Sequence, residues 1–253
     1  IEAKSVLYPD VAYPTYLVGA LLAQAAPTPV SLDAASWPQA DMAWVNSPSN
    51  PTGRVHSDSE LKEVLNWSEK SGAVVASDEC YLPFPDLKSG RSILAIAQGK
   101  NSNLLAVHSL SKRSNLAGYR GAFVAGDSKL IARLLEIRKH MGMMVPLPIQ
   151  KAVTVALSDE SHVREQATRY KNRRKVLSDA LEPLGFTIEF SEAGLYIWCT
   201  RGEEDWSTVQ WFAERGVLVT PGRFYGDKGA RYVRIALTAS DAKIAEAVSR
   251  LAS

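Results

Sequence analysis

A lysine with two serines before it and an arginine after it forms a reactive combination in this sequence. Ser109, Ser111 and Lys112 lie within four residues, and Arg120 follows eight positions after the lysine. A lysine amine forms a Schiff base with carbonyl compounds, and hydroxyls with a guanidinium fork suit a phosphate. Pyridoxal 5′-phosphate carries both an aldehyde and a phosphate, so these residues are candidates for binding it. The spacing alone also fits a lysine and an arginine on a surface loop.

The elements around these residues indicate a chain in which strands and helices alternate. Apolar runs at residues 42–45, 73–76 and 104–107 predict buried strands, and helical patterns are found at 16–25, 57–72, 130–140 and 149–157. Such alternation is typical of a largely parallel α/β sheet, in which ligands bind beyond the carboxyl ends of the strands. Asn50, Asp78 and Lys112 each follow one of these strands. We therefore expect them to meet in one crevice.

The pattern changes after residue 158. A long helix is expected over residues 159–184, followed by short strands at 186–190, 195–199, 217–220 and 232–237 and by helices at 206–215 and 241–251. These lengths indicate a compact α+β unit, so we expect two domains, 1–158 and 159–253. The basic run at residues 169–175 is interpreted as the solvated face of the long helix rather than as a nucleic-acid site.

The composition is that of an ordinary globular protein. The 253 residues are 46% hydrophobic and carry a formal net charge of +2, which argues against a dedicated nucleic-acid partner. No apolar run reaches the length of a membrane span, so no membrane partner is expected. Cys80 and Cys199 are predicted to be free thiols of a cytoplasmic protein, and the four scattered histidines predict no metal site. His108 is expected to pack in the core, and the start at Ile1 suggests a fragment of a longer polypeptide.

Four motifs in order resemble the fold-type I aminotransferases of class I/II. They are Ser-Pro-Ser-Asn-Pro-Thr-Gly at 47–53, Ser-Asp-Glu-Cys-Tyr at 77–81, Ser-Leu-Ser-Lys at 109–112 with Arg120, and Tyr-Val-Arg-Ile-Ala-Leu at 232–237. Within that family, residues 108–127 and 138–150 look most like N-succinyl-diaminopimelate aminotransferases. The resemblance implies a large α/β domain with a mainly parallel sheet that binds pyridoxal phosphate, followed by a smaller α+β domain. The family's segment before the first strand of this chain is missing here.

The resemblance implies roles for nine residues that match the family's motifs. Lys112 would hold the cofactor and shuttle a proton, and Asp78 would keep the pyridinium nitrogen protonated. Arg234 would clamp the substrate α-carboxylate with Asn50, and an arginine in an apolar strand does need a partner. The other roles are hydrogen bonds from Asn50 and Tyr81 to the phenolic oxygen, phosphate anchoring by Ser109, Ser111 and Arg120, and stacking by Tyr13 or a tyrosine near it. Lys112, Asp78 and Tyr81 are the expected catalytic residues.

The implied activity is a ping-pong transamination. Glutamate would give its amino group to the cofactor, and a keto acid, N-succinyl-2-amino-6-oxopimelate by resemblance, would receive it. The family further implies a homodimer with its active site at the subunit interface. Two alternatives stay open: a β-lyase on the same scaffold, and a non-enzymatic effector domain of a transcription regulator.

Overall fold

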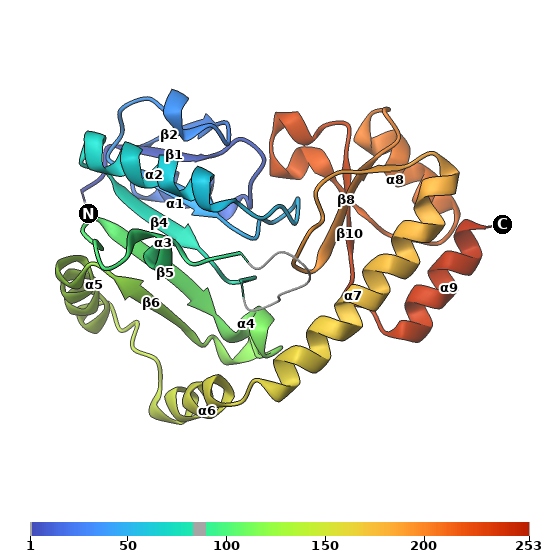
Figure 1. The fold of residues 1–253 in the computed structure, drawn as a ribbon. Coiled ribbons are helices and arrows are strands. Elements are labelled where there is room, and N and C mark those ends of the chain that lie inside the picture. The colour runs from blue at the N-terminus through green and yellow to red at the C-terminus, as the bar shows by residue number, and fades with distance from the viewer. Residues whose placement is uncertain (1, 83–89, 253) are drawn as a thin grey trace.

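The computed structural model describes residues 2–82 and 90–252, and its first part is built on a six-stranded sheet (Figure 1). The strand order is β2-β1-β3-β4-β5-β6; β1 to β5 run parallel, and β6 is antiparallel to β5. The bounds are β1 Ser5–Pro9, β2 Ala26–Val30, β3 Met42–Asn46, β4 Val74–Asp78, β5 Leu104–Ser109 and β6 Ala122–Gly126. The expected α/β fold with a mainly parallel sheet is confirmed.

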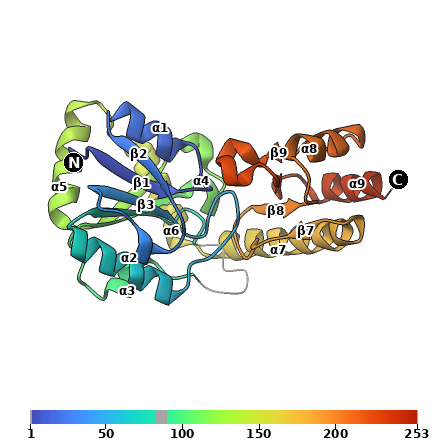
Figure 2. The same cartoon turned by 90° about the horizontal axis from the view of Figure 1, so that it is seen from above.

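Helices lie on both faces of this sheet (Figure 2). Helices α2 (Asp58–Ser71) and α3 (Ile93–Ala97) pack over one core, which contains Leu7, Val45, Leu61 and Val75. Helices α1 (Thr15–Leu22) and α5 (Ser128–His140) contact two smaller clusters on the other side. Because both faces are covered, the central strands contain runs of consecutive apolar residues, such as residues 74–76 in β4, rather than alternating ones.

A short helix connects the sheet to the second part of the chain. Helix α4 (Leu110–Arg113) carries Lys112, so the lysine follows β5 directly but lies on a helix. The buried Arg113 donates from Nη1 to the carbonyl of Ala156 at 2.7 Å and pairs with Glu160. Those partners lie at the end of α6 (Leu147–Ser158) and just before α7 (Ser161–Leu181). The lysine-bearing turn is therefore fixed to the helix that leads into the second part (Figure 1).

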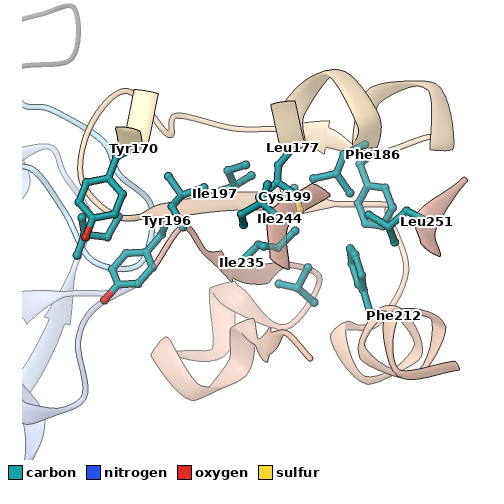
Figure 3. Packing of buried hydrophobic residues seen from close by; sticks show 14 of the residues in the cluster. Tyr170, Leu177, Phe186, Tyr196, Ile197, Cys199, Phe212, Ile235, Ile244 and Leu251 are labelled. Atoms are coloured by element: carbon teal, nitrogen blue, oxygen red, sulfur yellow. The ribbon is translucent and has the colours of Figure 1, made fainter. Parts of the chain in front are cut away.

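The second part is a four-stranded antiparallel sheet with the order β7-β8-β10-β9. Its strands are β7 Thr187–Ile188, β8 Tyr196–Thr200, β9 Thr220–Pro221 and β10 Val233–Ala236, and α8 (Asp205–Glu214) and α9 (Asp241–Leu251) accompany α7. Figure 3 shows the core, in which Leu177, Ile197, Phe212 and Ile235 meet between these elements. Single 3₁₀ turns lie at Ala34–Ser36, Ala117–Tyr119, Glu182–Leu184, Gly222–Tyr225 and Asp227–Gly229.

Three sequence-based expectations about this second part are wrong in detail. The strand expected at 217–220 is β9, which covers only Thr220–Pro221. The strand expected at 186–190 is only two residues long, because Phe190 and Ser191 both have left-handed backbone angles, with φ of 55°. The basic run of α7 is not wholly solvated. Arg173 is buried, donates to the carbonyl of Leu237 at 3.0 Å and pairs with Asp241 at 2.5 Å. It stabilises the contact between α7 and α9 instead of facing water.

The loop after β3 joins the two sheets through Gly53. The amide of Ser191 donates to the carbonyl of Thr52 at 2.9 Å, and the amide of Ala193 donates to that of Gly53 at 3.0 Å. Gly53 has a φ of +68°, and a Cβ placed on it would lie 2.7 Å from the carbonyl oxygen of Ala193. Only glycine fits this close approach, so the loop that contains Asn50 is held against the second sheet.

We predict that Gly53→Ala destabilises the protein more than Gly72→Ala does. Gly72 is the matched control because its φ of +71° is similar but a Cβ there would meet nothing within 4 Å. The left-handed angle alone costs about 1–2 kcal/mol for a non-glycine residue, and the clash at Gly53 adds roughly 1–3 kcal/mol. Urea unfolding measures both variants; equal losses would contradict the close approach.

Candidate active site

One cavity lies at the carboxyl ends of β3, β4 and β5 and reaches the second sheet. It has a volume of about 430 Å³, within the range usual for ligand pockets. All nine residues that the sequence singled out line it: Tyr13, Asn50, Asp78, Tyr81, Ser109, Ser111, Lys112, Arg120 and Arg234. They come from separate segments, so the convergence expected for Asn50, Asp78 and Lys112 extends to both serines, both arginines and both tyrosines.

The carboxylate of Asp78 is held by two donors. The phenol of Tyr16 donates to Oδ2 at 2.7 Å, and the amide of Cys80 donates to Oδ1 at 3.2 Å. The Tyr16 ring stacks on Trp44, with 5.0 Å between ring centroids. Burial and the neighbouring Asp78 charge raise the pKa of Tyr16 well above its ordinary value. The phenol therefore remains a donor, and it fixes the direction in which the carboxylate faces the cavity.

The serines and the arginine near Lys112 are arranged by short turns. Ser109 caps α4 by accepting the amide hydrogen of Ser111 at 3.1 Å, and its hydroxyl donates to the Ser111 hydroxyl at 2.9 Å. Arg120 has a left-handed φ of 55° and donates from Nη1 to the carbonyl of Ala117 at 2.8 Å. Two hydroxyls and a guanidinium group thus border the cavity next to the Lys112 amine, a donor set that suits an anion.

The loop that carries Asn50 is fixed by Asn46. The Asn46 side chain accepts from the amide of Asn50 at 2.8 Å and donates to the carbonyls of Pro48 at 3.1 Å and Asp78 at 2.9 Å. Because Asn46 is buried, these three hydrogen bonds replace the water it loses. They also tie the position of Asn50 to the end of β4, where Asp78 lies.

Arg234 projects from β10 toward the same loop. Its Nη1 donates to Oδ1 of Asn50 at 2.9 Å, and its guanidinium carbon lies 4.0 Å from the centroid of the Tyr196 ring and 5.0 Å from that of Tyr225. Its Nε is a buried atom without a hydrogen-bond partner among the described residues. A half-buried guanidinium that has no carboxylate partner in this part of the chain has unused donors for an anion.

A second contact between the two sheets involves Tyr81. Its hydroxyl lies 3.2 Å from that of Tyr196, which also lines the cavity. Burial is the main cause that raises the pKa of Tyr81 well above its ordinary value. The Tyr81 side chain therefore stays protonated, and its hydroxyl is held in the cavity wall by its contact with Tyr196.

The sequence did not reveal Tyr16, Asn46 or Tyr196 as site residues. A tyrosine cluster at 8–16 was visible, but nothing in it indicated which ring would reach Asp78. The expectation for His108 is wrong. It is partly exposed at the cavity wall, stacks on Phe123 at 5.0 Å, and places Nε2 3.1 Å from Glu79 Oε2.

The family follows from the match of the whole chain. The family model for aminotransferase class I and II matches residues 2–251, and the chain belongs to that family. Members of this family and fold depend on pyridoxal 5′-phosphate.

Two curated relatives are similar over nearly the full chain. The 4-dedimethylamino-4-oxo-anhydrotetracycline transaminase OxyQ of Streptomyces rimosus is 51% identical over 98% of this chain and 70% of its own length. A probable aminotransferase of Mycobacterium tuberculosis is 48% identical over 98% of this chain and 60% of its own. The chain thus spans 60 to 70% of the length of these two relatives.

Solved structures support the fold. An aminotransferase from Staphylococcus aureus matches with a TM-score of 0.89 at 28% identity, covering 98% of this chain and 70% of that one. A probable N-succinyldiaminopimelate aminotransferase from Thermus thermophilus matches with a TM-score of 0.87 at 28% identity, over 98% and 71%.

The cavity fits the family's cofactor. It offers an amine for the aldehyde, hydroxyl and guanidinium donors for the phosphate, and a carboxylate for the ring nitrogen. Arg234 Nε, which has no partner among the described residues, is a further donor of this cavity residue. Among the described ranges, no group of three His, Cys, Asp or Glu could hold a metal ion, and no helix is long and apolar enough to cross a membrane.

We predict that His56, at the end of the Asn50 loop, makes stability depend on pH. Burial and the nearby Arg54 charge lower its pKa from 6.5 to about 4. The unfolded chain therefore binds a proton between pH 6.5 and 4 that the folded protein does not. The contribution of His56 to the free energy of unfolding should be complete above pH 6.5. It should fall by roughly 2–3 kcal/mol as the pH drops to 4.

The measurement is urea unfolding at pH 7, 5.5 and 4. In His56→Gln this part of the loss should vanish, while Glu60, whose pKa is lowered to about 2, keeps titrating below that window. An equally steep pH dependence in wild type and His56→Gln would show that His56 is not the group responsible.

Proposed function

We propose that this protein is a pyridoxal-phosphate-dependent aminotransferase. The observation that carries the proposal is the single cavity in which Asp78, Lys112, Arg120 and Arg234 meet from different segments of the chain. Surface residues on unrelated loops would not be gathered around one opening. The family membership gives the reaction class, and the cavity provides residues for each of its requirements.

The residues of the chain would divide the work as follows. Lys112 would hold the cofactor covalently and, once released, move the proton at the substrate's α-carbon. When bound, the cofactor supplies an electron sink for the negative charge left at that carbon. Asp78, oriented by Tyr16, would keep the ring nitrogen protonated, and Ser109, Ser111 and Arg120 would anchor the phosphate. Asn50 and Tyr81 would donate to the phenolic oxygen, and the exposed Tyr13 would stack on the ring.

We further propose that Arg234 and Asn50 bind the α-carboxylate of the amino donor, with glutamate as that donor. The proposed acceptor is N-succinyl-2-amino-6-oxopimelate, supported by the Thermus thermophilus structure named above and by LL-diaminopimelate aminotransferases at about 30% identity. The higher identity of OxyQ favours a second candidate, a larger cyclic ketone. Measuring the rate of amino transfer to each acceptor distinguishes these two candidates. Release of pyruvate and ammonia in place of amino transfer would identify a β-lyase.

A homodimer is proposed because several large apolar side chains on neighbouring segments of the chain are exposed. Along α5, α6 and the turn between them, Leu135, Met141, Met143, Leu147 and Val155 are each 49 to 69% exposed. Where exposed apolar side chains form a patch, they mark an interaction surface. Tyr119, the neighbour of the cavity residue Arg120 in the sequence, is also exposed, at 49%. Sedimentation should give twice the chain mass.

Two further proposals concern organisation and compartment. We place the domain boundary between residues 158 and 159, at the junction between α6 and α7. We propose the cytoplasm as the compartment, because Cys80 and Cys199 are both free thiols. Neither is needed for the chemistry proposed above.

Lys112→Ala tests the covalent role directly. The protein is loaded with pyridoxal phosphate, reduced with borohydride and digested, and mass spectrometry locates the phosphopyridoxyl group. We expect it on Lys112 in the wild type and on no residue in the variant, with transamination lowered by about 10²- to 10⁴-fold because the general base is lost. The matched control is Lys129→Ala, an exposed lysine on α5. Label on Lys112 in the wild type but undiminished turnover in Lys112→Ala would refute the catalytic role alone.

Arg234→Ala tests the carboxylate clamp. Because charge-assisted hydrogen bonds are each worth roughly 1.5–3 kcal/mol, the Michaelis constant for glutamate should rise about 10- to 100-fold. Arg231→Ala is the control, since Arg231 is exposed three positions earlier and is absent from the cavity wall. Steady-state kinetics with varied glutamate measure this. The clamp lies elsewhere if both variants retain the wild-type Michaelis constant.

A further inference from the structure

Tyr81 and Tyr196 form a hydroxyl pair between the two sheets, inside the cavity wall. Tyr81 follows β4 of the six-stranded sheet, and Tyr196 begins β8 of the four-stranded sheet. Their hydroxyl oxygens lie 3.2 Å apart, and their ring planes are inclined by 69° with centroids 6.0 Å apart. Tyr81 is 4% exposed and Tyr196 8%. Each hydroxyl is therefore a hydrogen-bond partner of the other in a largely buried part of the wall.

The ring of Tyr196 makes a separate contact with Arg234. Tyr196 pairs with Ala236 across the antiparallel β8–β10 ladder, which places Arg234 two positions along the neighbouring strand. Side chains at such diagonal positions reach each other when one of them is long. The guanidinium carbon lies 4.0 Å from the ring centroid, within the distance of a cation–π interaction. The strand register therefore fixes the ring under the guanidinium group.

Packing alone does not explain the hydroxyl of Tyr196. The residue belongs to the core cluster of the second part, where a phenylalanine would fill the same space without a buried polar atom. Figure 3 shows that Tyr170 and Tyr196 both point their hydroxyls out of this core toward the first part of the chain. The hydroxyl of Tyr196 has its partner there, on a residue assigned to the cofactor.

We propose that Tyr196 is a positioning residue with two separable contacts. Its ring holds the Arg234 guanidinium in place for a substrate carboxylate, and its hydroxyl strengthens the hydrogen bond that Tyr81 donates to the cofactor's phenolic oxygen. The role of the Tyr196 hydroxyl rests on the proposed function. A hydroxyl that accepts one hydrogen bond becomes a stronger donor in the next. Tyr81 then draws more electron density from the conjugated Lys112 nitrogen and makes it less basic.

Tyr196→Phe removes the hydroxyl and keeps the ring. In protein loaded with pyridoxal phosphate, the visible absorption band of the lysine-linked cofactor is titrated with pH. We expect the midpoint to rise by roughly 0.3–0.5 pH unit, because the Lys112 nitrogen becomes more basic. Binding of propionate, a non-reactive carboxylate probe, should change by less than about twofold, since the cation–π contact remains. An unchanged midpoint overturns the role of the hydroxyl.

Tyr196→Met removes the aromatic face at similar volume. We expect the dissociation constant of propionate to rise roughly 5- to 10-fold, because Arg234 loses the ring beneath it. Propionate affinity equal to that of wild type overturns the role of the ring. Tyr196→Leu replaces this variant if thermal unfolding shows that the methionine protein is not folded.

Tyr170→Phe is the matched control, because it also removes one phenolic hydroxyl from the same core cluster. It should leave both the midpoint and propionate binding unchanged; a shift equal to that of Tyr196→Phe would assign the effect to the core in general and overturn the proposal.

Failure of the proposed function can be distinguished from failure of this inference. In that case the wild-type protein would show no visible band with pyridoxal phosphate and no borohydride-trapped label on Lys112.

Discussion

The hydrogen bond between Arg234 and Asn50 connects the two sheets at the cavity itself. Arg234 belongs to the four-stranded sheet and Asn50 to the loop after β3, and the two are 184 positions apart in the chain. A guanidinium group cannot be left in a half-buried site without partners, because its desolvation is costly. Its position therefore depends on the loop, and the loop depends on Asn46 and on Gly53, which hold it to β4 and to the second sheet. The geometry of the site is a property of this junction rather than of either sheet alone.

The residues that bear charge could be predicted from the sequence, and the ones that orient them could not. Asp78 and Lys112 follow apolar strands, a pattern local to each residue, whereas Arg234 was identified through the resemblance to the family. Tyr16 and Tyr196 act through partners 62 and 115 positions away, at Asp78 and Tyr81. A tyrosine in a helix or strand looks the same whether its hydroxyl faces water or a buried carboxylate. Only the packing of separate elements decides between these cases.

The same distinction applies to the fold. Long periodic patterns predicted the helices and the central strands because burial on a sheet demands them. The bounds of the short elements depend on backbone angles and on single side chains, which leave no periodic pattern in the sequence. Helix α3 is five residues long, too short for a period to show. Arg173 was concealed within a basic run, and only its buried contacts with Leu237 and Asp241 distinguish it from solvated neighbours such as Lys175.

The charge of the cavity wall follows from which groups can lose a proton. Burial raises the pKa of the phenols of Tyr16 and Tyr81 and of the thiol of Cys80, so these three remain neutral. One carboxylate, Asp78, then faces three side chains that are formally cationic, Lys112, Arg120 and Arg234. An excess of positive charge in a partly enclosed cavity favours anionic ligands. A phosphate near Arg120 and a carboxylate near Arg234 would each neutralise one cation. The neutral phenols of Tyr16 and Tyr81 would still donate hydrogen bonds beside these ligands.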